Sequence, residues 1–137
     1  MKIVLDTNIL LVSFSSKSSL HWIWKSLLDN QFTLCATTDI LLEYEEIIGR
    51  HLGKEVADAV LDAITDLPNL QLVSKYIFWQ LIEQDPDDNK FVDCAIACNA
   101  KYLVSEDRHF SILNEISFPK VEVIGVEAFR HAILSID

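Results

Sequence analysis

Residues 2–8 read KIVLDTN, an apolar run that stops at Asp6. A short apolar run bounded by polar residues predicts a buried strand. Thr7 and Asn8 follow, and both side chains can hydrogen-bond within a turn. We therefore expect Asp6 at the carboxyl end of a strand, where the chain leaves the sheet.

The rest of the chain alternates between helix-like and strand-like segments. Apolar residues at i, i+3, i+4 and i+7 predict amphipathic helices, and short apolar runs predict strands. The expected strands are residues 2–5, 32–36, 70–74, 102–105 and 121–124. The expected helices are residues 19–30, a helix capped by Thr38 or Asp39 that runs to about Gly49, residues 54–66, residues 75–83, a helix from Pro86 to about Asn99, a short helix after Asp107, and residues 126–136. This alternation predicts an α/β fold with a mainly parallel sheet of about five strands.

Composition points to one domain and restricts its function. Half of the 137 residues are hydrophobic, and because no linker or repeat divides them we expect a single domain over residues 1–137. The 21 acidic and 11 basic residues give a net charge of −10. This charge argues against a module that binds nucleic acid through Lys and Arg alone. A protein of this charge that handles nucleic acid needs another source of positive charge, such as a metal ion.

The start of the chain and its cysteines predict a cytoplasmic protein. Lys2 and Asp6 interrupt the first apolar segment, so it does not resemble a secretory signal. Cys35, Cys94 and Cys98 are interpreted as small core side chains in a reduced compartment, since they lack the spacing of a zinc site. Because no apolar run approaches the length of a membrane span, we expect no membrane association.

Four carboxylates occupy positions that a solvated surface does not explain. Asp6 and Asp107 each follow a predicted strand. Glu43 lies on an apolar helical stripe, and Asp88 extends an apolar face at the start of a helix. Each also has an ordinary interpretation, as a turn residue, a stripe-edge residue, an N-terminal helix charge or an N-cap. If all four converge at one end of the sheet, a divalent cation would offset their repulsion, and oxygen ligands suit Mg²⁺ or Mn²⁺.

The third acidic segment leaves a choice open. It offers Asp85, Asp87, Asp88 and Asp93. Helix geometry favours Asp88, which continues an apolar face. Asp93 is five residues later, about 140° around the helix, and is a secondary candidate for the metal.

These segments resemble, in order, the acidic motifs of PIN-domain nucleases. The resemblance covers about residues 1–110 and is carried by residues 6–8 (DTN), 41–44 (LLEY), 85–91 (DPDDNKF) with 95–97 (AIA), and 102–107 (YLVSED). The branch that it resembles most is the VapC-like toxins of bacterial toxin–antitoxin pairs.

The resemblance implies a three-layer α/β/α sandwich and a metal-dependent endoribonuclease that cleaves RNA. It implies that one or two Mg²⁺ or Mn²⁺ ions are held by four catalytic carboxylates: Asp6, Glu43, Asp88 and Asp107. It further implies a homodimer and a cognate antitoxin protein that inhibits it.

Neighbouring polar residues are expected to support this site. Asn8 is interpreted either as a residue that orients Asp6 or as a turn residue. Ser105 stands where many family members carry Thr, and its hydroxyl can supply the same hydrogen bond. Glu43 is the candidate for positioning the attacking water. Six basic residues are either phosphate contacts or ordinary surface charges: Lys17, Lys25, Arg50, Lys54, Lys90 and Arg108.

The main alternative is a catalytically idle PIN-fold module that binds a protein partner. In that case some of its aromatic side chains would be exposed for binding: Trp22, Trp24, Phe78 and Trp79. Phosphotransfer and Ser-His-Asp hydrolysis are weaker alternatives, because the chain has neither Asp-x-Asp after its first strand nor a Gly-x-Ser-x-Gly motif.

Overall fold

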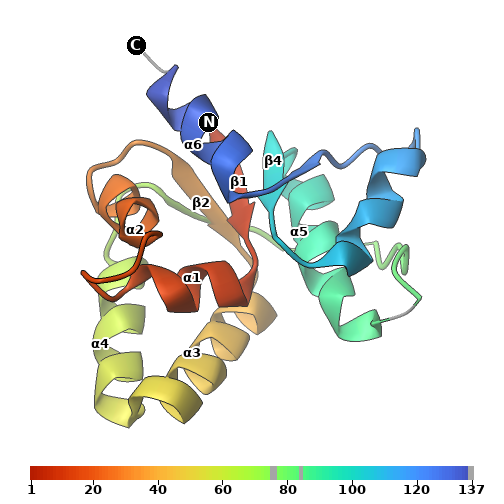
Figure 1. The fold of residues 1–137 in the computed structure, drawn as a ribbon. Helices are drawn as coiled ribbons and strands as arrows, with labels where there is room; N and C mark the ends of the chain where they lie inside the picture. Colours follow the sequence, from red (N-terminus) through yellow and green to blue (C-terminus); the bar gives the residue numbers. More distant parts are fainter. Residues whose placement is uncertain (75–76, 84, 136–137) are drawn as a thin grey trace.

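A five-stranded parallel sheet forms the centre of the protein in the computed structural model, which describes residues 1–74, 77–83 and 85–135 (Figure 1). The strand order is β3-β2-β1-β4-β5, and every neighbouring pair is parallel. The strands are β1 (Lys2–Leu5), β2 (Thr33–Ala36), β3 (Leu70–Leu72), β4 (Tyr102–Val104) and β5 (Val123–Ile124). The predicted α/β fold with five parallel strands is confirmed.

Helices cover both faces of this sheet. They are α1 (Thr7–Ser13), α2 (His21–Leu28), α3 (Thr38–Leu52), α4 (Lys54–Thr65), α5 (Asn89–Cys98) and α6 (Val126–Leu134), with the 3₁₀ helices η1 (Pro86–Asp88) and η2 (Arg108–Glu115). Helix α5 packs against β1, β2 and β4, whereas α1 and α2 lie on the other side of the sheet (Figure 1). Across the described ranges, no helix combines the length and apolar character that crossing a bilayer requires.

The strand order determines where a ligand site is expected. From β1 the chain moves outward through β2 to β3, and then returns to place β4 on the other side of β1. Ligands of parallel α/β sheets bind beyond the carboxyl ends of the strands at this point of reversal. The register pairs Leu5 with Val104. The next residue of each strand, Asp6 and Ser105, therefore lies at this position.

The core fills the space between the sheet and its helices with fully buried aliphatic and aromatic side chains, including Val4, Leu34 and Phe91. The three cysteines are buried and free, as the sequence predicts. Trp22 and Trp24 pack partly against the core, so they are not the exposed aromatics that the alternative hypothesis considered.

One helix is absent from the prediction, and the N-cap of another differs from it. Helix α1 is not predicted, because Thr7 and Asn8 are interpreted as a turn although they begin a helix. Thr37 caps α3 in place of the predicted Thr38 or Asp39, and its Oγ1 accepts a hydrogen bond from the Ile40 N–H at 3.4 Å.

The helix predicted over residues 75–83 is wrong in its described part. Residues 77–83 form an irregular loop, while residues 75 and 76 lie outside the described residues.

Side chains of α5 explain why this loop is not helical. The Trp79 N–H donates to Asp93 Oδ1 at 3.2 Å. The Asn89 side chain accepts from the Ile82 N–H at 2.9 Å and donates to the Ile82 carbonyl at 3.0 Å. Because α5 satisfies these backbone groups, the loop needs no helical hydrogen bonds at them.

Candidate functional site

Asp6 lies at the carboxyl end of β1 and is 8% exposed. It occupies the N-cap position of α1, but its side chain makes no capping bond. Instead, the Ser105 hydroxyl donates to Asp6 Oδ2 at 2.8 Å. The same hydroxyl accepts from the Asp107 N–H at 3.0 Å. Ser105 therefore holds the segment that carries Asp107 beside Asp6.

The charge on Asp6 is opposed by burial and by neighbouring acids. Burial raises the pKa of Asp6, and the carboxylates of Asp107 and Glu43 raise it further. The hydrogen bonds from Ser105 and from the backbone N–H of Asn8 act in the opposite direction. The Asn8 side chain itself is exposed, so in this structure Asn8 acts on Asp6 through its backbone.

Glu43 extends from α3 and is only 16% exposed. Its Oε1 forms an ion pair with Lys90 Nζ at 2.7 Å, and its Oε2 accepts a hydrogen bond from the Thr7 hydroxyl. Lys90 also bonds Asp87 Oδ1 at 2.9 Å. Burial opposes the charge on Lys90, yet its bonds to Glu43 and Asp87 raise its pKa. Lys90 is therefore the buried counter-ion of Glu43 rather than an ordinary surface charge.

Asp88 ends η1, and its side chain is 15% exposed. Burial, followed by the carboxylates of Asp85, Asp107 and Asp6, raises the pKa of Asp88 to about 7. Its Oδ2 atom is buried and has no hydrogen-bond partner within the described ranges. Among the acids predicted from the sequence, Asp88 is thus the one whose buried oxygen is left unsatisfied.

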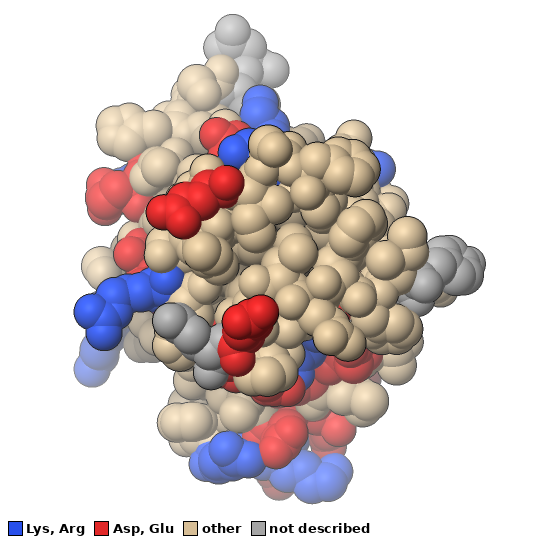
Figure 2. Space-filling model, turned by 90° about the vertical axis from the view of Figure 1, so that its right-hand side faces the viewer, with Lys and Arg blue, Asp and Glu red and all other residues tan. Residues whose placement is uncertain are grey.

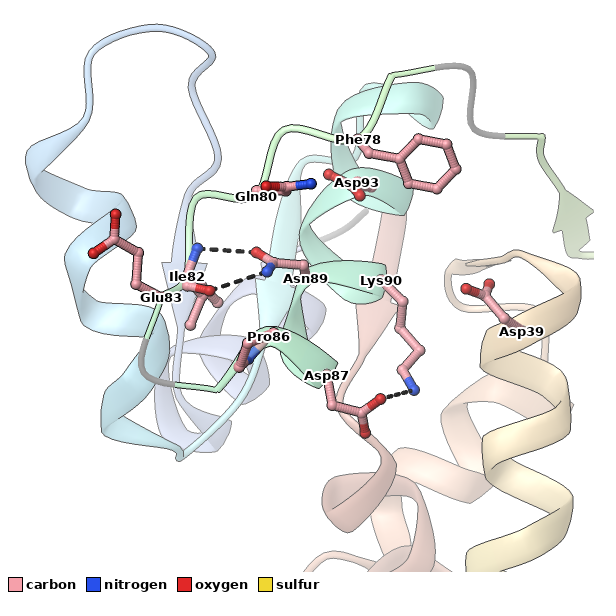
Figure 3. Close-up of a pocket in the computed structure, with 10 residues that line it drawn as sticks. All are labelled: Asp39, Phe78, Gln80, Ile82, Glu83, Pro86, Asp87, Asn89, Lys90 and Asp93. Carbon is pink, nitrogen blue, oxygen red and sulfur yellow. Dashed lines mark hydrogen bonds and ion pairs between the residues drawn. The ribbon is translucent and has the colours of Figure 1, made fainter.

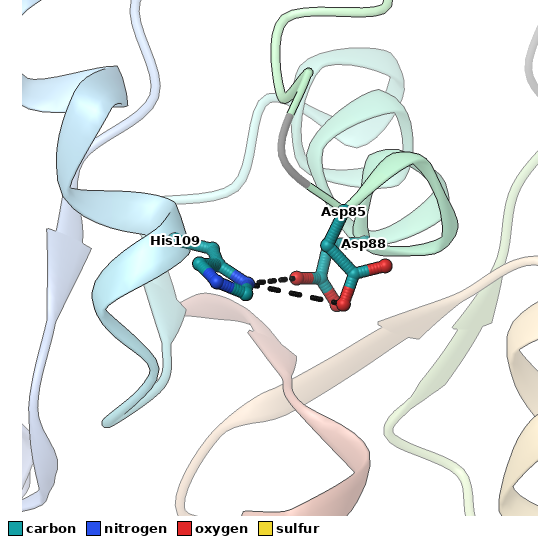
Figure 4. A group of neighbouring side chains, drawn as sticks. All are labelled: Asp85, Asp88 and His109. Atoms are coloured by element: carbon teal, nitrogen blue, oxygen red, sulfur yellow. Dashed lines mark ion pairs between the residues drawn. The ribbon is translucent and has the colours of Figure 1, made fainter.

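His109 was not among the residues selected from the sequence, and it lies against the acids (Figure 4). Its Nδ1 atom is 3.5 Å from Asp107 Oδ1, 3.6 Å from Asp88 Oδ2 and 3.8 Å from Asp85 Oδ2. The backbone N–H of His109 donates to Asp107 Oδ1 at 2.9 Å, so Asp107 also caps η2. Its position in the sequence could have indicated this role, because His109 is two residues after Asp107 and follows the same strand.

Tyr44 stabilises the position of the site, a role that the sequence does not predict. It is fully buried, and its hydroxyl donates to the Leu5 carbonyl at 2.7 Å. This bond ties α3, which carries Glu43, to the end of β1. An apolar helical stripe predicts that Tyr44 is buried, but it does not predict this partner.

Asp93 faces a neighbouring pocket instead of the group around Asp88 (Figure 3). It is 3% exposed and accepts the hydrogen bond from Trp79 described above. The pocket has a volume of about 670 Å³, and Phe78 and Lys90 are also part of its lining. Because Lys90 reaches Glu43 as well, the pocket adjoins the acidic site.

One face of the molecule carries a large uncharged area, although the pocket itself is lined by charged residues as well as apolar ones. Figure 2 views the side that lies at the right of Figure 1, and side chains other than Lys, Arg, Asp and Glu cover most of its centre and right, whereas most charged residues lie at the left and below. Elements on this side carry the exposed apolar residues Phe78, Ile112 and Phe118. Elsewhere, Arg50 pairs with Glu46 and Lys54 with Asp58 on exposed helix surfaces.

Together, these contacts describe a cluster of acids at the point of reversal of the sheet. The carboxylates of Asp107 and Glu43 raise the pKa of Asp6, and those of Asp6 and Asp107 raise the pKa of Asp88. Repulsion among buried carboxylates falls when a divalent cation binds between them, and their oxygens are suitable ligands for it. Among the described residues, the group whose ligand atoms all lie within 4.8 Å of one another is Asp85, Asp88 and His109. Of the four predicted carboxylates the structure therefore places Asp88 in this group, with Asp6 and Asp107 near it and Glu43 paired with Lys90.

Comparisons with known proteins agree with this architecture. A family model described as "PIN domain" matches residues 2–109. A chain in the crystal structure of VapBC2 from Rickettsia felis, bound to a DNA fragment from their promoter, has a similar fold, with a TM-score of 0.61 and 22% sequence identity. The alignment covers 91% of this chain and 98% of that chain. No curated protein sequence matches.

Proposed function

Because the chain belongs to the PIN domain family, we propose that it is a metal-dependent endoribonuclease that hydrolyses phosphodiester bonds in RNA. The observation that carries this proposal is the group of acids near the carboxyl ends of β1 and β4, where Asp6 is buried and the carboxylates of Asp6 and Asp107 act on Asp88. A cluster of this kind is costly without a cation and useful for phosphoryl chemistry with one.

The residues present fit a divalent cation. The buried Asp88 Oδ2 lacks a hydrogen-bond partner in the described part of the chain, and the carboxylates of Asp6 and Asp107 act on it. An oxygen in this situation is satisfied by a cation. Asp6, Glu43, Asp88 and Asp107 are the proposed ligands of Mg²⁺ or Mn²⁺, directly or through water. When bound, the cation would lower the pKa of a water and polarise the scissile phosphate.

Other side chains of the protein orient the proposed ligands and contact the substrate. Ser105 keeps the Asp6 carboxylate oriented through its 2.8 Å hydrogen bond. Thr7 and Lys90 fix both oxygens of Glu43, which is the proposed group that positions the attacking water. Lys90 is also the proposed contact to a phosphate oxygen, since it lies between the acids and the adjoining pocket.

The biological setting is proposed from the family and the fold. The similar structure contains VapBC2 with promoter DNA. We propose that this chain is likewise the toxin of a toxin–antitoxin pair, inhibited by an antitoxin protein, and that it works as a homodimer in the cytoplasm. Its single PIN domain over residues 1–137 would carry the whole activity.

A second candidate function is an idle module that binds a protein partner. Two observations favour it: Lys90 already neutralises Glu43, and Phe78 and Phe118 are 64% and 81% exposed. A purified protein that cleaves no RNA in Mg²⁺ or Mn²⁺ and binds neither ion would support this alternative.

The test is cleavage of a mixed RNA pool by protein stripped of metal and then supplied with Mg²⁺ or Mn²⁺. We expect EDTA to stop cleavage, and Asp6→Asn and Asp107→Asn to reduce it by about two orders of magnitude or more while circular dichroism is unchanged. Asp62→Asn is the matched control, because Asp62 is an exposed acid on α4. Full activity of Asp6→Asn, in a preparation free of other nucleases, would contradict the proposal.

A further inference from the structure

We propose that His109 is a direct ligand of the bound cation through Nδ1, together with Asp85 and Asp88, and that this nitrogen makes the site select a first-row transition ion over Mg²⁺. The inference rests on the proposed cation site and adds His109, a ligand outside the acidic motifs, and Asp85, an acid of the third motif that is not among the four proposed ligands. It assigns the site a chemical preference that an all-carboxylate site would lack.

The first support is distance. Asp85, Asp88 and His109 each offer a ligand atom, and these atoms all lie within 4.8 Å of one another (Figure 4). His109 Nδ1 is 3.6 Å from Asp88 Oδ2 and 3.8 Å from Asp85 Oδ2, which is longer than a hydrogen bond. Adjacent ligands of an octahedral ion lie roughly 3 Å apart and opposite ligands roughly 4 Å apart. The group is therefore spaced for an ion at its centre.

The second support is the lack of hydrogen-bond partners and is independent of the distances. His109 Nδ1 and Asp88 Oδ2 are both buried atoms, and neither has a hydrogen-bond partner in residues 1–74, 77–83 or 85–135. Buried polar atoms without partners are rare, and a bound ion is one explanation for them. One cation between the two atoms would satisfy both.

The backbone holds these ligands in place before any ion binds. The Asp88 N–H donates to the Asp85 carbonyl at 3.0 Å, which fixes the two acids across η1. On the other side of the group, the backbone N–H of His109 donates to Asp107 Oδ1 at 2.9 Å, and Ser105 links Asp107 to Asp6. The imidazole is thus attached to the same network as the acids at the end of β1.

The donor set then determines the preference. Mg²⁺ favours oxygen ligands and retains its waters, so an imidazole contributes little to its binding. Ions such as Co²⁺ and Zn²⁺ bind imidazole nitrogen well. A site in which an imidazole joins the carboxylates should bind Co²⁺ much more tightly than Mg²⁺.

The test uses Co²⁺ and Mg²⁺ with the full-length, metal-free protein. Calorimetry measures both affinities, and proton NMR of the Co²⁺ protein detects the strongly shifted, exchangeable N–H proton of a coordinated imidazole. We expect this signal in the wild type and its loss in His109→Asn. The same substitution should weaken Co²⁺ binding at least about tenfold and change Mg²⁺ binding less than about threefold. His131→Asn is the control, because His131 is an exposed histidine on α6.

Absence of the shifted signal in the wild type, or its survival in His109→Asn, would overturn the inference. Equal losses of Co²⁺ and Mg²⁺ affinity would also overturn it, since His109 would then only position the acids. RNA cleavage in Mg²⁺ separates this outcome from failure of the proposed function. EDTA-sensitive cleavage without the imidazole signal refutes the ligand alone, whereas the signal without cleavage in any ion refutes the nuclease alone.

Discussion

The acids of the site are hydrogen-bonded or paired in different ways. Ser105 donates to Asp6, Lys90 pairs with Glu43, and the His109 N–H donates to Asp107. Asp88 Oδ2 has no such donor among the residues that the structure describes. A carboxylate in this position favours its protonated form until a cation arrives.

This difference predicts how the stability of the metal-free protein depends on pH. The pKa of Asp88 is about 7 in the folded protein, against about 3.9 in an unfolded chain. Between these values the folded state binds more protons than the unfolded state, so the free energy of unfolding falls as pH rises. Asp88→Asn removes this loss. With solvent screening at a partly exposed group, we expect the variant to be more stable than the wild type by about 1 kcal/mol at pH 8, and equally stable below pH 4.

Urea unfolding in EDTA at the two pH values measures this effect. Asp62→Asn, an exposed acid, should show no such pH-dependent difference. A variant at Asp88 that is less stable than the wild type at pH 8 would refute the assignment of an uncompensated charge.

At the scale of elements, the sequence predicts the apolar strands and the amphipathic helices well because each has a local period. Residues 77–83 depart from the prediction for a non-local reason. Its apolar spacing resembles a helix, but Asn89 and Asp93 of α5 take its backbone groups. No local pattern contains that information. Helix α1 is missed for another reason: the polar pair Thr7 and Asn8 suits a turn and a helix start equally.

The bonds from Asn89 to Ile82 predict the stability of this loop. Asn89→Ala removes both hydrogen bonds. It leaves the backbone N–H and carbonyl of the buried residue Ile82 without these partners. We expect the free energy of unfolding to fall by about 1–3 kcal/mol. Hydrogen exchange at the Ile82 amide should become faster, whereas Glu83→Ala, a change at an exposed loop position, should leave it unchanged. Unaltered exchange in Asn89→Ala would show that other contacts hold the loop.

At the scale of the whole molecule, strand order brings together acids that are distant in sequence. Alternation of helices and strands predicts a parallel sheet, and the ends of its strands predict the positions of Asp6 and Asp107. The placement of β4 beside β1 cannot be read from the alternation, yet it puts Ser105 within 2.8 Å of Asp6. His109 and Lys90 enter the site for the same reason: their partners come from other elements.

Because the site joins several elements, an ion bound there should stabilise the entire fold. At a Mn²⁺ concentration one hundred times its dissociation constant, we expect a gain of about 2.7 kcal/mol in the free energy of unfolding. For a chain of this length, this corresponds to a rise of about 10 °C in Tm. Differential scanning calorimetry measures the shift, which should nearly vanish in Asp6→Asn. A wild-type Tm that does not respond to Mn²⁺ would mean that the acids hold no ion.

The most direct measurement is a crystal structure of the protein grown with Mn²⁺, with anomalous scattering recorded to locate the metal. We expect an anomalous peak between Asp6, Asp88 and Asp107, within bonding distance of at least two of their oxygens, and no such peak in Asp6→Asn. A wild-type map with the acids in place and no peak among them would contradict this expectation.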